Sequence, residues 1–205
     1  MAGIHNNWAG SPYQDLAKCL DFLKQVPYID LDNAVAAGES YGGDIINWIQ
    51  GHELGRKVSS NQPALSTGSH LTLPPQFKAL TTIDGVFSLK SSMVDTDAPL
   101  GGPDFNGPNY PWANVQEVEK WDPSRPELLR NWTTPALVVH NDRDYRLPIT
   151  HGLSAFTTLQ MKGTPSRFLH FPDEGHFVEK PDNLVQFYHV IFDWMGRYSG
   201  AKPTE

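Results

Sequence analysis

The amino-acid sequence predicts an α/β fold in which a mostly parallel sheet is flanked by helices. Short apolar runs alternate along the chain with segments of helical periodicity, which is the pattern of successive β-α-β units. The apolar runs lack a polar alternation, as expected of strands that a parallel sheet buries on both faces. Of the 205 residues, 39% are hydrophobic and 19% are charged, so we expect one domain with a substantial core.

The first half of the chain is predicted to hold two helices and two strands. Ser11 is a suitable helix N-cap, and Pro12 fits the first helical position. Leu16, Leu20 and Leu23 follow at helical spacing and form the expected apolar face of the first helix. The elements expected here are a helix over residues 12–25, a strand over 33–38, a helix over 44–50 and a strand over 80–84.

The second half repeats this alternation and closes with a long helix. Its expected elements are a strand over residues 136–140, a helix over 149–161, a strand over 167–171 and a helix over 183–197. Residues 95–126, which precede them, are rich in Gly, Pro, Asn and Trp. This composition indicates an irregular but ordered excursion.

Residues 58–76 differ in composition from the rest of the chain. They include no charged residue, three prolines and four serines, which predicts a disordered insertion. The nineteen residues begin with Val, whose codons start with GT, and end with Gln, which CAG can encode. A retained intron is therefore a second hypothesis for the same segment.

Composition and charge argue against several classes of function. The net charge of −7 gives no basic face for nucleic acid, and no apolar run approaches the roughly 18 residues of a membrane span. Cys19 is the single cysteine and has no partner for an internal disulfide. The eight histidines are scattered without metal-ligand spacing, so we expect no metal and no cofactor. The first residues show no signal-peptide pattern.

The strongest chemical motif is Gly-Glu-Ser-Tyr-Gly at residues 38–42, which matches G-x-S-x-G. This motif needs a sharp strand-to-helix turn that holds its serine at the tip, and an apolar strand precedes it while a helix follows. We therefore predict that Ser40 is a nucleophile. The alternative is that Ser40 only caps the following helix.

A serine nucleophile needs a base and an orienting acid. In the α/β-hydrolase fold these follow in the order Ser, Asp, His, each after a later strand. Asp142 and Asp144 come just after the third expected strand, and His176 comes just after the fourth. Either aspartate fits the acid on this reasoning, and each also suits a turn. His140 ends a strand and is interpreted as structural.

Three runs carry a more specific resemblance: Gly-Glu-Ser-Tyr-Gly-Gly at 38–43, His-Asn-Asp-Arg-Asp-Tyr-Arg-Leu-Pro at 140–148 and Phe-Pro-Asp-Glu-Gly-His at 171–176. Together they resemble the prolyl oligopeptidase family of serine peptidases, and within it the fungal dipeptidyl-peptidase V enzymes. The likeness spans nearly the whole chain except residues 58–76. Further runs that agree lie at residues 6–8, 46–51, 54–57, 105–107, 121–124 and 165–169.

The resemblance implies a role for each residue of the site. Ser40 matches the nucleophile and His176 the general base, and the family motif His-Gly-x-x-Asp-x-Arg-Val-Pro selects Asp144 as the acid. Asn141 stands where that motif usually has Gly.

Three more positions match the substrate-binding residues of the family. Arg146 matches a contact to a substrate carbonyl, and Leu147 an apolar position beside the nucleophile. Tyr41 is expected to give its backbone N–H to the oxyanion hole and its ring to the same pocket.

By this resemblance, residues 1–205 are one catalytic domain, the C-terminal part of an α/β-hydrolase fold that is incomplete at its N-terminus. A β-propeller, the first strands of the sheet, a second oxyanion donor and groups for the substrate amine are expected upstream. The implied enzyme is a secreted serine peptidase that cleaves dipeptides from peptide N-termini through an acyl-enzyme. An esterase and a catalytically inert fragment are the alternatives.

Overall fold

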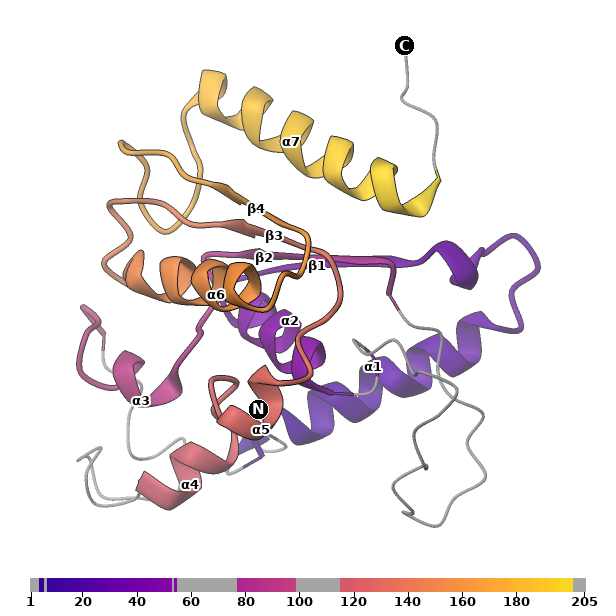
Figure 1. Cartoon of the computed structure of the whole chain (residues 1–205), viewed down its shortest axis with the longest axis horizontal. Helices are drawn as coiled ribbons and strands as arrows, with labels where there is room; N and C mark the ends of the chain where they lie inside the picture. Colours follow the sequence, from indigo (N-terminus) through magenta and orange to yellow (C-terminus); the bar gives the residue numbers. More distant parts are fainter. Residues whose placement is uncertain (1–3, 6, 53, 55–76, 99–114, 201–205) are drawn as a thin grey trace.

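The computed structural model describes residues 4, 5, 7–52, 54, 77–98 and 115–200. Four strands form one parallel sheet, with helices packed on both of its faces (Figure 1). The predicted α/β class is confirmed. The expected insertion at residues 58–76 lies outside the described residues.

The sheet has the strand order β1-β2-β3-β4, so neighbouring strands follow one another along the chain. All three pairs are parallel, and Val35 lies opposite Ala79 in the first of them. The carboxyl ends of the strands therefore meet at one edge of the sheet, where the segments that follow them come together. The strands are β1 (Val35–Glu39), β2 (Ala79–Ile83), β3 (Ala136–Val139) and β4 (Ser166–Leu169).

The four longer helices are close to the predicted positions. They are α1 (Gly10–Leu23), α2 (Tyr41–Gly51), α6 (Thr150–Met161) and α7 (Pro181–Ser199). Shorter helical segments are η2 (Leu31–Asn33), α3 (Leu89–Ser92), α4 (Val115–Lys120) and α5 (Pro126–Leu129). None of the described helices combines the length and the apolar character that crossing a membrane requires.

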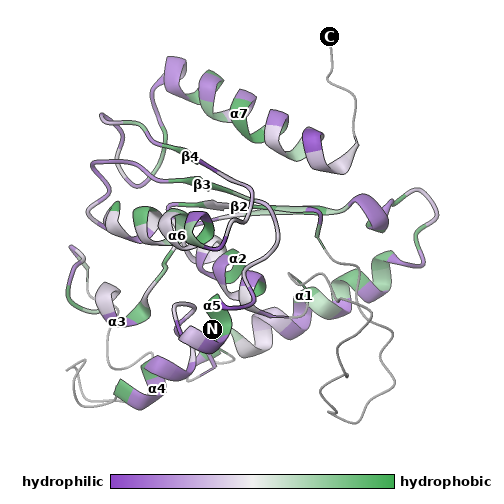
Figure 2. Ribbon diagram, viewed as in Figure 1, coloured by the Kyte–Doolittle hydropathy of each residue, from purple (hydrophilic) through white to green (hydrophobic). Residues whose placement is uncertain are grey.

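Two apolar clusters, one on each face of the sheet, hold the layers together. On β3, Ala136 and Val138 point to the cluster that includes residues of α2 and α6, whereas Leu137 and Val139 point to the cluster that includes residues of α7. This alternation is what the period of two in a strand dictates. Hydrophobic and hydrophilic residues also alternate along α7, as expected of a helix with one apolar face (Figure 2).

The first strand departs from the prediction of burial on both faces. β1 is half-buried to exposed, although β2 and β3 are buried along their whole length. The reason is its place in the sheet: among the described residues, only β2 pairs with β1, so the other side of β1 is an edge. Ala36 and Ala37 line an apolar groove of about 450 Å³ at this edge, together with residues of α1 and α2.

The beginning of α1 also differs from the prediction. The helix starts at Gly10 with Ala9 in the N-cap position and no side-chain capping bond. Ser11 is not the cap, because it is the second residue of the helix, and its Oγ accepts a hydrogen bond from Asn7 Nδ2 at 2.6 Å. Of the three leucines expected on the apolar face, only Leu20 is buried, because α1 packs against α2 on one side alone.

Part of the excursion expected over residues 95–126 is helical. Val115–Lys120 forms α4, and Val118 and Trp121 enter the core. The sequence pattern did not predict this short helix, because glycine and proline are frequent in the segment. Its single apolar turn is shorter than the window in which helical periodicity is recognised.

Candidate active site

The turn between β1 and α2 holds Ser40 in a conformation that few residues adopt. Its φ is 57° and its ψ is −118°, and its N–H donates to Ile83 O at 2.9 Å. Such strain persists only where the surroundings enforce it. Here the neighbouring glycines allow the close approach: a Cβ on Gly38 would lie 2.2 Å from Gly42 O, and one on Gly43 would lie 2.6 Å from Gly85 Cα.

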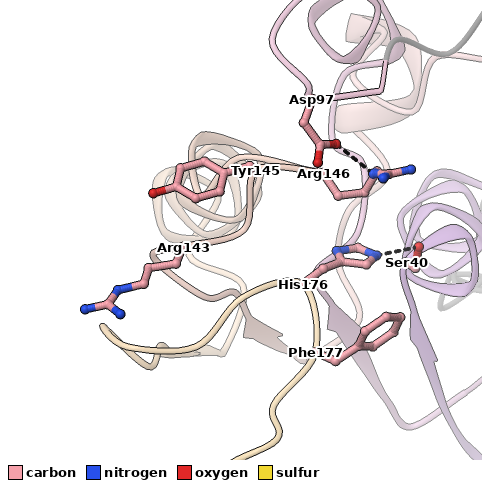
Figure 3. Close-up of a pocket in the computed structure, with 7 residues that line it drawn as sticks. All are labelled: Ser40, Asp97, Arg143, Tyr145, Arg146, His176 and Phe177. Atoms are coloured by element: carbon pink, nitrogen blue, oxygen red, sulfur yellow. Dashed lines mark hydrogen bonds and ion pairs between the residues drawn. The ribbon is translucent and has the colours of Figure 1, made fainter.

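The turn presents the hydroxyl of Ser40 to His176. Nε2 of His176 lies 2.9 Å from Ser40 Oγ, across 136 positions of sequence (Figure 3). Nδ1 of the same ring lies 2.8 Å from Asp144 Oδ2. Because a carboxylate only accepts, Nδ1 carries the hydrogen and Nε2 is left to accept the serine proton. The Ser40 side chain makes no capping bond to α2.

Asp144 is held by its own loop. It is buried, and its Oδ1 accepts from the backbone N–H groups of Arg146 at 2.9 Å and Leu147 at 2.8 Å. Asp142 faces the surface instead, and its Oδ1 lies 3.0 Å from Nδ1 of His170. Of the two aspartates that the residues alone left open, the structure brings Asp144 to His176.

His140 and Asp84 form a buried polar layer beneath this loop. Nε2 of His140 donates to Leu147 O at 2.6 Å, and burial lowers the pKa of His140. Burial also raises the pKa of Asp84 to about 8, although a hydrogen bond from Asn141 N–H opposes that rise. His140 thus has the structural position expected of it.

Asp84, His140 and Asp144 place potential ligand atoms within 4.8 Å of one another. Their hydrogen bonds argue against a metal there. The Nε2 hydrogen of His140 is donated to a carbonyl, and oxygens of both carboxylates accept from N–H groups. A carboxylate that accepts an N–H can still bind a cation, but Nε2 of His140 carries the donated hydrogen and has no lone pair for one. The described residues of this cluster therefore do not fit a metal centre.

A cavity of about 540 Å³ opens beside Ser40 and His176. The other residues that line it are Asp97, Arg143, Tyr145, Arg146 and Phe177 (Figure 3). Arg146 Nε donates to Asp97 Oδ1 at 2.9 Å. Sequence reasoning missed Asp97, because nothing in its neighbourhood indicates that it lies near a loop 49 residues later.

Two residues expected in the pocket lie elsewhere. The ring of Tyr41 packs edge-on against Trp8, with 5.0 Å between ring centroids, and its hydroxyl donates to Trp8 O. It borders the apolar groove at the edge of β1. Leu147 is buried in the core beneath the loop. Tyr41 is the first residue of α2, so its backbone N–H has no acceptor within the helix.

A second buried carboxylate, Asp44, lies one turn into α2. Trp8 Nε1 donates to its Oδ2 at 2.6 Å. Burial raises the pKa of Asp44 to about 8; the Trp8 bond opposes the rise, and the nearby Asp122 adds to it. The sequence reasoning missed this contact, because an acidic residue in the first turn of a helix is ordinarily explained by the helix dipole.

Comparison with known proteins finds relatives over nearly the whole chain. The profile described as the prolyl oligopeptidase family matches residues 1–56 and 64–202. The chain is 43% identical over 202 residues to a probable dipeptidyl-peptidase 5 of Aspergillus terreus, and 43% identical over 203 residues to a dipeptidyl-peptidase 5 of Trichophyton equinum. Each match covers 98% of this chain and 25% of the relative, so the chain spans a quarter of the length of these curated relatives.

Solved structures support the same fold. An uncomplexed acylaminoacyl peptidase of Pyrococcus horikoshii superposes with a TM-score of 0.67 at 21% identity, over 90% of this chain and 27% of that one. At this identity the likeness shows the α/β-hydrolase-like fold alone. The family profile covers most of the chain, and the chain therefore belongs to the prolyl oligopeptidase family.

Proposed function

We propose that this chain is the catalytic segment of a serine peptidase that releases dipeptides from the N-termini of peptides. The observation that carries the proposal is the placement of His176, whose two ring nitrogens reach Ser40 Oγ at 2.9 Å and Asp144 Oδ2 at 2.8 Å. A serine hydroxyl is a weak nucleophile, and this arrangement supplies both the base and the group that orients it.

These hydrogen bonds support the following reaction. Nε2 of His176 takes the proton of Ser40 as Oγ attacks the peptide carbonyl, while Asp144 stabilises the imidazolium that forms. The imidazolium then gives its proton to the leaving amine, and the N-terminal part of the peptide remains as an ester on Ser40. Water, deprotonated by His176, attacks this acyl-enzyme and releases the product.

The turn also supplies electrostatic stabilisation. Tyr41 directly follows Ser40 and opens α2, so its N–H is available to the oxyanion that forms on the attacked carbonyl. One donor of this kind is worth about 2.7–4 kcal/mol in the transition state. The positive end of α2 acts in the same direction.

The substrate class rests on a different argument. The curated relatives at 43% identity are named dipeptidyl-peptidase 5, and the chain covers a quarter of each. Within this chain, the cavity beside Ser40 offers the guanidinium of Arg146 for a substrate carbonyl and the carboxylate of Asp97 beside it.

A fluorophosphonate probe tests the nucleophile. We expect it to label Ser40 in the folded protein and to leave the Ser40→Ala variant unlabelled. Absence of labelling in the unaltered protein would favour the inert alternative. Paired assays on aminoacyl-dipeptide and short-chain ester substrates then decide the substrate class, because an esterase would turn over only the second.

A further inference from the structure

The loop that carries His176 is tied to the loop that carries Asp144 by a buried amide that the mechanism does not use. Nδ2 of Asn141 donates to Gly175 O at 2.9 Å, and Gly175 directly precedes His176. The same Nδ2 donates to Asp84 Oδ2 at 3.2 Å. One amide group therefore spans the end of β2 and the histidine loop.

Asp84 fixes which way this amide points. Its Oδ1 accepts from the backbone N–H of Asn141 at 2.9 Å, and its Oδ2 accepts from the side chain. If the amide were turned over, its oxygen would face Gly175 O, where two acceptors would repel, and Asp84 Oδ2 would lose the side-chain N–H that it accepts. In the observed orientation Asn141 Oδ1 is buried without a partner. The arrangement thus keeps both donors in place at the cost of a buried, unpaired oxygen.

The position of the amide matters because the other bonds between the two loops, apart from that of His176 itself to Asp144, are made by residues farther from His176 along the chain. Asp142 N–H donates to Phe171 O at 3.1 Å, and Arg143 N–H donates to Glu174 O at 3.0 Å. The Asn141 bond is the one that reaches the residue next to His176. Because Asn141 and Asp84 are both fully buried, water does not compete for the bonds between them, whereas Gly175 is half-buried.

We propose that Asn141, oriented by Asp84, is a positioning residue for His176: its amide holds the Gly175 carbonyl, and with it the imidazole, against Asp144 and Ser40. The inference rests on the proposed function in taking His176 as the base. It adds the requirement that a further buried side chain, Asn141, holds the loop of His176 in place.

Two variants test the proposal. Asn141→Ala removes both donated bonds. Asp84→Asn keeps the shape of the side chain but offers a single oxygen, so one of the two N–H groups of Asn141 loses its acceptor. We expect each variant to slow fluorophosphonate labelling of Ser40 on the order of tenfold to a hundredfold, since misplacement of a catalytic group by about 1 Å has effects of that size.

Asn47→Ala is the matched control. Asn47 is also a buried asparagine, and its Nδ2 donates to the backbone oxygen of Val86 at 2.7 Å. Its loss is expected to lower the unfolding temperature while leaving the labelling rate unchanged. Labelling of Asn141→Ala at the unaltered rate would overturn the proposal, as would an equal slowing in Asn47→Ala.

A second measurement separates this proposal from the proposed function. The Nδ1–H of His176, bonded to Asp144, is expected to give a downfield proton resonance in NMR spectra. This resonance should weaken in Asn141→Ala and in Asp84→Asn and persist in Asn47→Ala. If the probe does not label the unaltered protein, the proposed function is wrong, but the NMR resonance still tests the role of Asn141. Persistence of the resonance in Asn141→Ala would show that the amide does not position His176.

Discussion

Oδ2 of Asp144 lies 2.8 Å from Nδ1 of His176, whereas Asp142, two residues earlier in the same loop, faces His170. The difference comes from the turn between them. Asp144 N–H bonds to Asn141 O at 3.3 Å, which folds the chain back, and the N–H groups of Arg146 and Leu147 then hold the Asp144 carboxylate in the interior.

This relationship predicts opposite outcomes for two identical changes. Asp144→Asn should lower the rate of labelling or hydrolysis by about 10³–10⁴-fold, because the imidazole loses the acceptor that fixes its tautomer. Asp142→Asn should have little effect, because it alters only an exposed contact with His170. The labelling rates of the two variants, measured under the same conditions, test this prediction. A larger loss of rate in Asp142→Asn than in Asp144→Asn would contradict the assignment of Asp144.

The turn at Ser40 predicts a contrast between two glycines. Gly38→Ala would place a Cβ 2.2 Å from Gly42 O, so we expect a loss of about 1–3 kcal/mol in the free energy of unfolding, together with slower labelling of Ser40. A Cβ on Gly42 meets no atom within 4 Å, and this residue lies in α2. Gly42→Ala should therefore stabilise the protein by about 0.5–1 kcal/mol. Urea unfolding of both variants would test this, and equal losses would argue against the packing explanation.

Asp44 predicts a pH dependence of stability. Its pKa is about 8 in the folded protein and ordinarily 3.8, so between these values the folded state holds a proton that the unfolded chain has released. The contribution of Asp44 to the free energy of unfolding therefore falls as the pH rises from about 4 to about 8.

Asp44→Asn cannot titrate, and its side-chain oxygen still accepts from Trp8 Nε1. Relative to the unaltered protein, this variant should become more stable as the pH is raised from 5 to 9. Denaturant unfolding at the two pH values measures the difference. A gap that stays constant, or that shrinks toward pH 9, would contradict the buried, protonated carboxylate.

The pair formed by Arg146 and Asp97 predicts an effect on substrate binding without an effect on folding. Both side chains are about half exposed, and such pairs contribute only about 0–1 kcal/mol to stability. Arg146→Met should therefore leave the unfolding temperature nearly unchanged and raise KM for peptide substrates more than it lowers kcat. A selective fall in kcat would place Arg146 in the chemical step instead.

The free edge of β1 predicts self-association of the 205-residue chain. Ala37 is exposed there beside the apolar groove, and the described part of the chain places no strand against it. Unpaired edges of this kind template contacts between molecules, and an edge lysine opposes them. Ala37→Lys should therefore reduce the apparent mass in light scattering at high concentration. An unaltered chain that remains monomeric would contradict the prediction.

The succession of strands and helices along the chain and the turn at Ser40 could be predicted from the sequence alone. Strand and helix periodicity are local properties of the sequence, and the G-x-S-x-G motif that predicts the turn consists of five consecutive residues. The sequence also predicted that the loops after the third and fourth strands lie close together, because parallel strands bring their carboxyl ends to one edge of the sheet. These loops carry Asp144 and His176. Local pattern could not choose between Asp142 and Asp144, and only the resemblance to a family favoured one of them.

Tertiary structure alone decided the contacts between distant segments. The bond from Trp8 to Asp44, the pairing of Arg146 with Asp97 and the reach of Asn141 to Gly175 join residues 34 to 49 positions apart. The exposure of β1 likewise depends on which strands flank it. The sequence of an apolar strand does not show whether the strand lies at the edge or in the centre of a sheet. Such contacts depend on how the sheet twists and how each loop turns after its strand, and these are set by packing across the whole fold.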